Sequence, residues 1–426
     1  MKNAFSFMRG NVLVLSISGA LGMFSRGMVF PYVPLYIMTL GGQPAEVGIV
    51  YALGPLGGLL IFPIAGYLAD HLNRAKLIAA AGFAASFIIL INVFAQSWEW
   101  VAVSRFLWGF IVFHFPAQSA ILADSLPPEN RGRGLATMNT VSGSAGILSP
   151  YVAGLALDYY GVDFGMRILY SVMSVAYFGT ALINLWFIRE TRDAIDNDIS
   201  LSNASETLQN AYSGIPDMLR RLPRSMKGLA AIIILAFVAN GISGPFWVVY
   251  AKEILDLSSS QWGLILLIES IVRSLIGIPA GFVVDRFGRT RFIILSLLLG
   301  GAAIYSFGLI SGFVAVLVVR CLVAIVTAFI SPACGALVAD LVPRDIRGRT
   351  MAAIGRGTVR FGAASGGTGG PGMGFLITIP LIVASFCGGI LFESDPMSPW
   401  VLVPGIMTIA AFIAIFFVKD PKDAEI

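Results

Sequence analysis

Long runs of uncharged residues constrain this chain more than any other feature. Residues 229–250 and 401–418 contain no acidic or basic side chain, and a helix of about 20 apolar residues crosses the hydrocarbon core of a bilayer. Hydrophobic residues make up 57% of the chain and charged residues 12%, against roughly 45–50% and about 25% in soluble proteins. The sequence therefore predicts an all-α membrane protein.

Twelve stretches of membrane length can be marked, six on each side of a polar segment. The segment at residues 189–227 carries six basic and six acidic side chains, too many for burial in lipid. It predicts an N-terminal six-helix bundle at 1–190, a linker at 191–227 and a C-terminal six-helix bundle at 228–426. The twelve spans are predicted near residues 11–38, 46–69, 77–95, 100–123, 136–157, 168–188, 229–250, 261–284, 292–310, 313–338, 373–392 and 398–418.

The basic residues indicate how the chain lies in its membrane. With twelve spans, both termini share a side with the even-numbered loops, and 22 of the 28 Lys and Arg residues fall on that side. Because basic loops stay in the cytoplasm, we expect a multi-pass protein of the cell membrane with both termini cytoplasmic. The net charge of +4 is slight, so nucleic acid is not an expected partner.

The two halves repeat each other at an almost constant offset. The motif GYLADHLNR, which begins at Gly66, returns as GFVVDRFGR at Gly281, and Arg105 returns as Arg320; each shift is 215 residues. Parallel repeats of this kind place a solute site between the halves near the bilayer midplane. The two bundles are therefore expected to be pseudo-symmetric.

The register breaks after Arg349, where about 19 extra residues are needed to align the halves again. This insertion, near 352–374, contains nine glycines between Gly355 and Gly374. Its GGTGGPG run lacks the Lys and Ser or Thr that end a phosphate-binding loop. We expect it to be a flexible cytoplasmic loop.

These motifs resemble those of the major facilitator superfamily over essentially the whole chain. In that family the loop between helices 2 and 3 reads GxxxDRxGRK or close to it. Residues 281–291 fit this motif at every important position, whereas the first copy has His71 and Asn73 in place of Arg and Gly. Arg105 with Gly109 resembles the RxxxG element of helix 4. The resemblance implies the twelve-helix fold of this family, with solute transport by alternating access.

The expected function is secondary active transport of a small organic solute. The segment FPYVPLY at Phe30 resembles the end of helix 1 in drug exporters, and the resemblance implies proton-coupled efflux of drugs or metabolites by a monomer. An uptake symporter or facilitator for a small organic anion or sugar is the alternative. An enzyme would need a cluster of nucleophile, base or metal ligands, and two distant histidines with three isolated cysteines predict none. No cofactor or metal is expected.

Carboxylates at the cytoplasmic ends of helices are candidates for gating. Asp70 and Asp285 can lie against the positive N-terminal end of a helix from the opposite half, which would favour the state closed to the cytoplasm. The arginines four residues later can pair with acids that close helices 4 and 10. The predicted gating residues are Asp70, Arg74, Asp124, Asp285, Arg289 and Asp340.

Ionised side chains inside the spans are candidates for the transport site. Each costs at least ~2.5–3.5 kcal/mol at the bilayer centre and so is expected to face a cavity or a partner. They are predicted at similar depths, as one band of net charge +3 that would suit a carboxylate-bearing solute; alternatively, the arginines bind backbone carbonyls. The five residues are Arg26, Arg105, Glu269, Arg273 and Arg320.

Glu269 is the best candidate for coupling to protons, because it is the single carboxylate well inside a span. Arg273, one turn away, favours its ionised form. His114 lies nine residues after Arg105, about 180° around an α-helix, so it is expected to point away from the cavity.

Two further residues complete the predicted substrate site. Asn240 opens the stretch NGISGP, which interrupts helix 7 as expected beside a binding site. Tyr32 is an expected cavity aromatic. The predicted substrate-binding residues are Arg26, Arg105, Tyr32, Asn240 and Arg320, and the predicted proton-coupling residues are Glu269 and Arg273.

Overall fold

A computed structural model describes residues 8–192, 219–343, 346–355, 357, 359, 361, 362 and 374–420. Within these residues, twelve segments are long and apolar enough to cross a membrane, as the sequence predicts. Most of the predicted linker, at 193–218, lies outside the described residues.

The first six spans form the N-terminal half. Several of them consist of two helices in succession, joined by a short 3₁₀ turn or a kink. The elements are α1 (Gly10–Val29), η1 (Phe30–Tyr32), α2 (Val33–Thr39), α3 (Pro44–His71), α4 (Arg74–Val93), α5 (Trp98–Phe110), η2 (Ile111–His114), α6 (Phe115–Ser125), η3 (Pro128–Asn130), α7 (Arg131–Ala145), α8 (Ser149–Tyr160) and α9 (Val162–Phe187).

The last six spans form the C-terminal half. The first of them is again divided into two helices, and the fifth follows a short helix and the glycine-rich insertion. The elements are α12 (Arg224–Ser243), α13 (Phe246–Glu253), α14 (Ser259–Phe287), α15 (Arg289–Phe307), α16 (Phe313–Leu341), α17 (Arg347–Ile354), α18 (Phe375–Ser394) and α19 (Ser398–Phe417).

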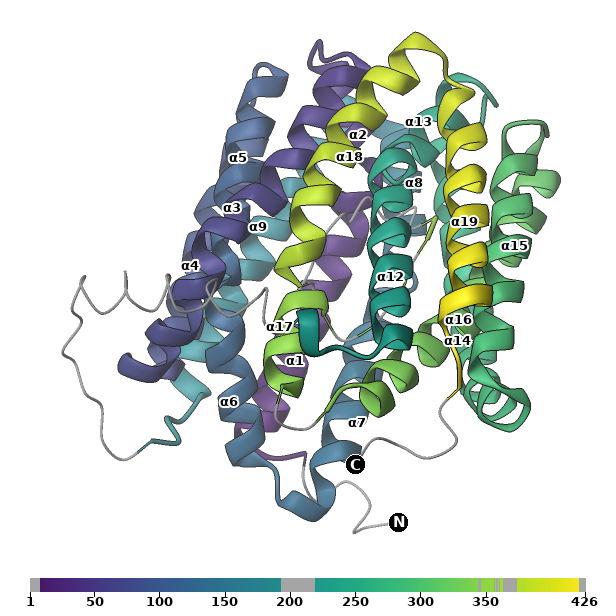
Figure 1. Cartoon of the computed structure of the whole chain (residues 1–426). Helices are drawn as coiled ribbons and strands as arrows, with labels where there is room; N and C mark the ends of the chain where they lie inside the picture. Colours follow the sequence, from purple (N-terminus) through teal and green to yellow (C-terminus); the bar gives the residue numbers. More distant parts are fainter. Residues whose placement is uncertain are drawn as a thin grey trace.

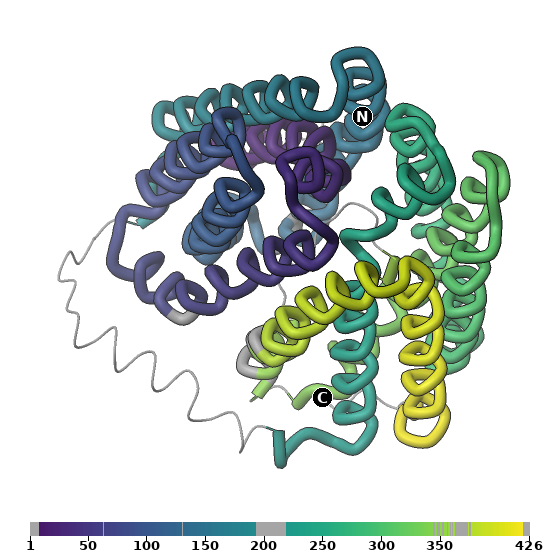
Figure 2. The backbone as a smooth tube through the Cα atoms, turned by 90° about the horizontal axis from the view of Figure 1, so that it is seen from above, coloured from purple at the N-terminus to yellow at the C-terminus, as the bar shows by residue number. Residues whose placement is uncertain are grey.

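The two halves lie side by side as separate bundles (Figure 2), and each contains six of the twelve described spans. Helix α1 begins and α19 ends at the same face of the molecule (Figure 1); we call this the terminal face and the opposite one the far face. The predicted pair of six-helix bundles is confirmed.

Breaks within the spans follow proline and glycine. Helix α12 ends at Ser243 and α13 begins at Phe246, so the interruption predicted at Gly244 and Pro245 is present. The fourth span is also broken, by η2 between α5 and α6, just before Pro116 at the start of α6. Proline has no N–H to continue the helical ladder and clashes with the preceding turn.

The glycine-rich insertion does not stay at the terminal face as the sequence suggested. Among its described residues, Val359 is 0% and Phe361 is 1% exposed, and both belong to the apolar core of the C-terminal half. The carbonyl oxygen of Gly362 accepts a hydrogen bond of 2.8 Å from Nη1 of Arg320. These two side chains are therefore buried inside the bundle, and the expectation of a flexible cytoplasmic loop is wrong for this described part of the insertion.

Candidate functional site

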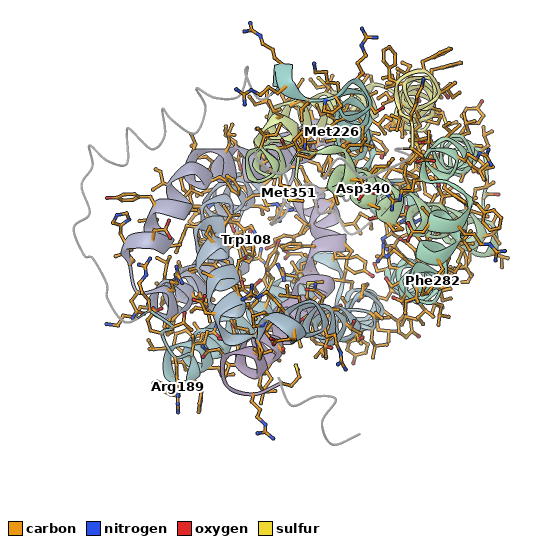
Figure 3. All side chains as sticks on the ribbon, turned by 60° about the horizontal axis from the view of Figure 1, so that its bottom comes forward. Trp108, Arg189, Met226, Phe282, Asp340 and Met351 are labelled. Atoms are coloured by element: carbon orange, nitrogen blue, oxygen red, sulfur yellow. The ribbon has the colours of Figure 1, made fainter. Side chains whose placement is uncertain are left out.

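A cavity of about 340 Å³ lies inside the N-terminal half. Its walls come from α1, α3, α4, α5, α6 and α9, and Thr378 of α18 is its one lining residue from the C-terminal half among those described. Figure 3, which brings the terminal face forward, shows the lining residue Trp108 among these helices, away from the rim where Arg189 lies. We take this cavity as the candidate functional site.

The cavity runs from the middle of the bundle toward the terminal face. Along the first span it is lined from Phe30 of η1 back to Leu15 of α1, which is five residues from the start of α1. On α9 it reaches Asn184, three residues before the helix ends at Phe187. A solute could therefore enter it from the side of the two termini.

Basic side chains set the charge of the cavity. The predicted residues Arg26 and Arg105 both line it. The guanidinium of Arg105 lies over the rings of Phe30 and Tyr51, 4.9 and 5.0 Å from their centroids. Arg26 donates through Nε to the carbonyl oxygen of Gly22 at 3.1 Å. No carboxylate is found among the described lining residues, so the cavity favours a negatively charged solute.

His114 also lines the cavity, contrary to the expectation that it points away. The expectation assumed a continuous α-helix, whereas His114 ends the 3₁₀ segment η2. A 3₁₀-helix turns about 120° per residue instead of about 100°, so four such residues change the direction of the side chain. Pro116 in the sequence was the signal that the helix is interrupted there.

Aromatic rings line the apolar walls of the cavity. Phe30 and Trp108 meet edge to face with centroids 6.0 Å apart, and Trp108 meets Tyr177 in the same way at 5.4 Å. All three residues line the cavity. Edge-to-face pairs give such walls a defined shape, so the site combines a rigid apolar surface with basic groups.

The other three charged residues inside the spans form a separate cluster in the C-terminal half. Oε2 of Glu269 accepts from Nη2 of Arg320 at 2.6 Å and from its Nε at 3.2 Å, and Oε1 lies 3.5 Å from Nη1 of Arg273. Arg320 is 0% exposed, with its guanidinium 4.3 Å from the ring centroid of Trp247. The expected single band of charge is thus divided between a cavity and an ion cluster around the buried pair of Glu269 and Arg320.

Tyr32 and Asn240 lie outside the cavity. Asn240 is 3% exposed on α12. The hydroxyl of Tyr32 lies 2.8 Å from the carbonyl oxygen of Pro150 and 3.0 Å from that of Ser259. Since Pro150 and Ser259 belong to different halves, Tyr32 connects the halves.

Two carboxylates join the halves at the far face, in a set of contacts that we call the far-face seal. Asp158, near the end of α8, accepts hydrogen bonds of 2.8 and 2.9 Å from the backbone N–H groups of Ser259 and Ser260 at the start of α14. Glu393, near the end of α18, accepts 3.0 Å from the N–H of Ala45 at the start of α3. Neither carboxylate was predicted from the sequence to have this role.

Glycines let the helices of the far-face seal approach closely. A Cβ on Gly154 would overlap the carbonyl oxygen of Ser259, and one on Gly389 would lie 2.7 Å from the carbonyl oxygen of Pro44. Both glycines therefore allow backbone-to-backbone packing between halves. The far face is closed, while the cavity extends toward the terminal face.

The ion pairs expected at the terminal face are present in both halves. Nη1 of Arg74 lies 3.1 Å from Oδ2 of Asp124, and Arg289 pairs with Asp340. Asp70 lies 3.9 Å from Arg74, and Asp285 lies 3.2 Å from Nε of Arg289. Each of these pairs lies within one half.

Comparisons with known proteins identify the family. The model of the Major Facilitator Superfamily matches residues 15–226 and 229–426. A multi-drug resistance efflux pump PmrA homolog from Lactococcus lactis subsp. lactis (strain IL1403) is 23% identical over 332 residues, covering 75% of this chain and 78% of that protein. The multidrug resistance protein MdtG of Salmonella arizonae is 26% identical over 298 residues, 66% of this chain and 69% of its own.

Solved structures agree in fold. The nucleoside transporter NupG has a TM-score of 0.71 at 15% identity, covering 97% of this chain and 100% of its own. A bacterial homolog to the human lysosomal transporter Spinster, in an inward-facing and unoccupied conformation, has a TM-score of 0.67 at 16% identity, with 99% and 100% covered. With the family model matched across both halves, the chain belongs to the Major Facilitator Superfamily and is a secondary transporter.

Proposed function

We propose that this transporter exports amphiphilic organic compounds from the cytoplasm in exchange for protons. The observation that carries the proposal is the cavity, in which aromatic walls surround the basic residues Arg26 and Arg105. An apolar pocket with a few polar groups at defined positions suits a small molecule that has both an apolar part and a polar part. The relatives named for multidrug resistance support export as the direction.

The same proposal places the terminal face in the cytoplasm of the cell. The excess of Lys and Arg in the loops on that side supports this orientation. The structure would then be the inward-facing state of a monomer in the cell membrane, with its cavity open to cytoplasmic substrate. The ion pairs around Asp70 and Asp285 would rearrange when the terminal face closes, as expected of gating residues.

We assign proton coupling to Glu269 and its partners. Its carboxylate contacts the guanidinium groups of both Arg273 and Arg320 in this state. Rocking of the halves would separate Glu269 from Arg320 or Arg273, which would link proton exchange at this carboxylate to the conformational change. Exchange of substrate for protons needs a group that gains and loses a proton as the transporter changes state, and we propose Glu269 as that group.

Transport by purified protein in liposomes tests the proposal. A fluorescent amphiphilic dye should accumulate against its gradient when the pH gradient drives protons the opposite way, and collapse of that gradient should stop it. Glu269→Gln should abolish this accumulation but preserve dye exchange at equal pH, because exchange moves no net protons. Dye movement that ignores the pH gradient in the unmodified protein would overturn the proposed coupling.

A further inference from the structure

The two halves surround a pair of equivalent arginines in similar ways. Arg105 and Arg320 are related by the repeat of 215 residues. Each guanidinium lies against one ring from the first span of its half and one from the second. The rings are Phe30 and Tyr51, at 4.9 and 5.0 Å, for Arg105, and Trp247 and Trp262, at 4.3 and 5.9 Å, for Arg320.

The halves differ in what lies beside the guanidinium group. In the C-terminal half the carboxylate of Glu269 receives two hydrogen bonds from Arg320. The same shift of 215 places Gly54 at the position of Glu269 and Gly58 at that of Arg273. The N-terminal half therefore lacks both side chains of the cluster.

The missing side chains leave space that belongs to the cavity. Gly54 and Gly58 both line it, together with Arg105. A Cβ built on Gly54 would lie 3.6 Å from Cγ and 3.9 Å from Nε of Arg105, and one on Gly58 would lie 3.6 Å from the carbonyl oxygen of Gly109. These are ordinary contact distances, so packing alone does not demand glycine at either position.

We propose that a carboxylate of the transported compound occupies the place beside Arg105 that the carboxylate of Glu269 occupies beside Arg320. The inference rests on the proposed function and names its substrate class: amphiphilic carboxylates. Guanidinium groups bind carboxylates through two parallel N–H donors. The rings of Phe30 and Trp108 then contact the apolar body of the compound, and Arg26 adds positive charge to the same cavity.

A pair of variants at Gly54 separates charge from bulk. Gly54→Glu supplies the N-terminal half with its own carboxylate, and Gly54→Gln adds a side chain of nearly the same size without the charge. The probes are 2-naphthoxyacetate and its neutral analogue 2-naphthoxyacetamide. Binding is measured by calorimetry on purified protein in nanodiscs at low salt.

We expect the unmodified protein to bind the carboxylate at least ~10-fold more tightly than the amide. One hydrogen bond to a charged group contributes enough binding free energy for a difference of this size. Gly54→Gln should keep a preference for the carboxylate, whereas Gly54→Glu should lose it. Equal affinity for the two probes in the unmodified protein, or equal preference in the two variants, would overturn the inference. If Gly54→Glu does not fold, Arg105→Gln should remove the same preference.

Dye transport distinguishes this inference from the proposed function. If a pH gradient drives export of a cationic dye while the two probes bind equally, the carboxylate site is refuted and proton-coupled export stands. If the carboxylate preference is present but no flux responds to pH, the binding inference is supported and the proposed coupling fails.

Discussion

Asp158→Ala is expected to weaken the far-face seal and to favour opening of that face. The carboxylate accepts hydrogen bonds from two N–H groups of α14, while α14 keeps its own cap, in which Ser258 accepts from the N–H of Gln261. The substitution therefore affects the contact between halves more than the helix. Loss of an N-terminal cap costs about 0.5–2 kcal/mol, so the population open at the far face should rise roughly 2- to 30-fold.

Labelling of a buried cysteine measures this population. Ser259→Cys is suitable because Ser259 is 2% exposed and its hydroxyl has no hydrogen-bond partner among the described residues. The native cysteines Cys321, Cys334 and Cys387 are first replaced by alanine. A membrane-impermeant maleimide applied from the far face then reacts at a rate proportional to the time that face spends open.

Asp163→Ala is the matched control. Asp163 lies near the same face, but its ion pair, at 2.9 Å, is with Arg167 of its own helix α9. Removal of the Asp163 carboxylate should leave the labelling rate equal to that of the Ser259→Cys protein without this substitution. If Asp158→Ala labels no faster than Asp163→Ala, the carboxylate of Asp158 does not hold the far face closed.

Three further substitutions test other parts of the structure. Gly154→Ala should separate α8 from α14, because its methyl group would overlap the carbonyl oxygen of Ser259; the maleimide assay should show faster labelling, and an unchanged rate would contradict the close packing. Glu269→Ala should lower the free energy of unfolding by about 3–5 kcal/mol, because it leaves the buried Arg320 without its counter-charge; denaturant unfolding in detergent checks this, and a loss below about 1 kcal/mol, the worth of an exposed pair, would contradict it. Asp285→Asn should slow dye transport without reducing the amount of protein in the membrane, as expected of a gating residue; an unchanged rate would remove it from that role.

The positions of the spans could be predicted from the sequence because hydrocarbon demands long uncharged helices. The predicted span at residues 100–123 corresponds to Trp98–Ser125, and the one at 398–418 to Ser398–Phe417. The break in helix 7 could be predicted as well, since glycine followed by proline interrupts a helix. The break at η2 was missed, and with it the direction of His114.

The candidate site could be predicted only in part. Arg26 and Arg105 were expected at a cavity because charge inside a span needs a polar environment, and both line one. The same argument also selected Arg320, which lies in a buried pair with Glu269. Composition cannot tell a charge facing a cavity from one facing a partner, because both avoid lipid.

The far-face seal could not be predicted because its chemistry is mostly backbone. Asp158 accepts from N–H groups that every residue except proline carries, so no complementary side chain appears in the sequence. The insertion was misjudged for a related reason: its glycines suggested a free loop, whereas Val359 and Phe361 between them are buried.

Photoaffinity labelling tests most directly whether the cavity of the N-terminal half is the substrate site. A transported compound that carries a diazirine is photolysed with the protein in nanodiscs, and the modified peptides are identified by mass spectrometry. We expect modification on α1, α3, α5 and α9 that is suppressed by excess unlabelled compound and reduced in Arg105→Gln. Modification concentrated around Arg320 in the C-terminal half, or unaffected by the competitor and by Arg105→Gln, would contradict it.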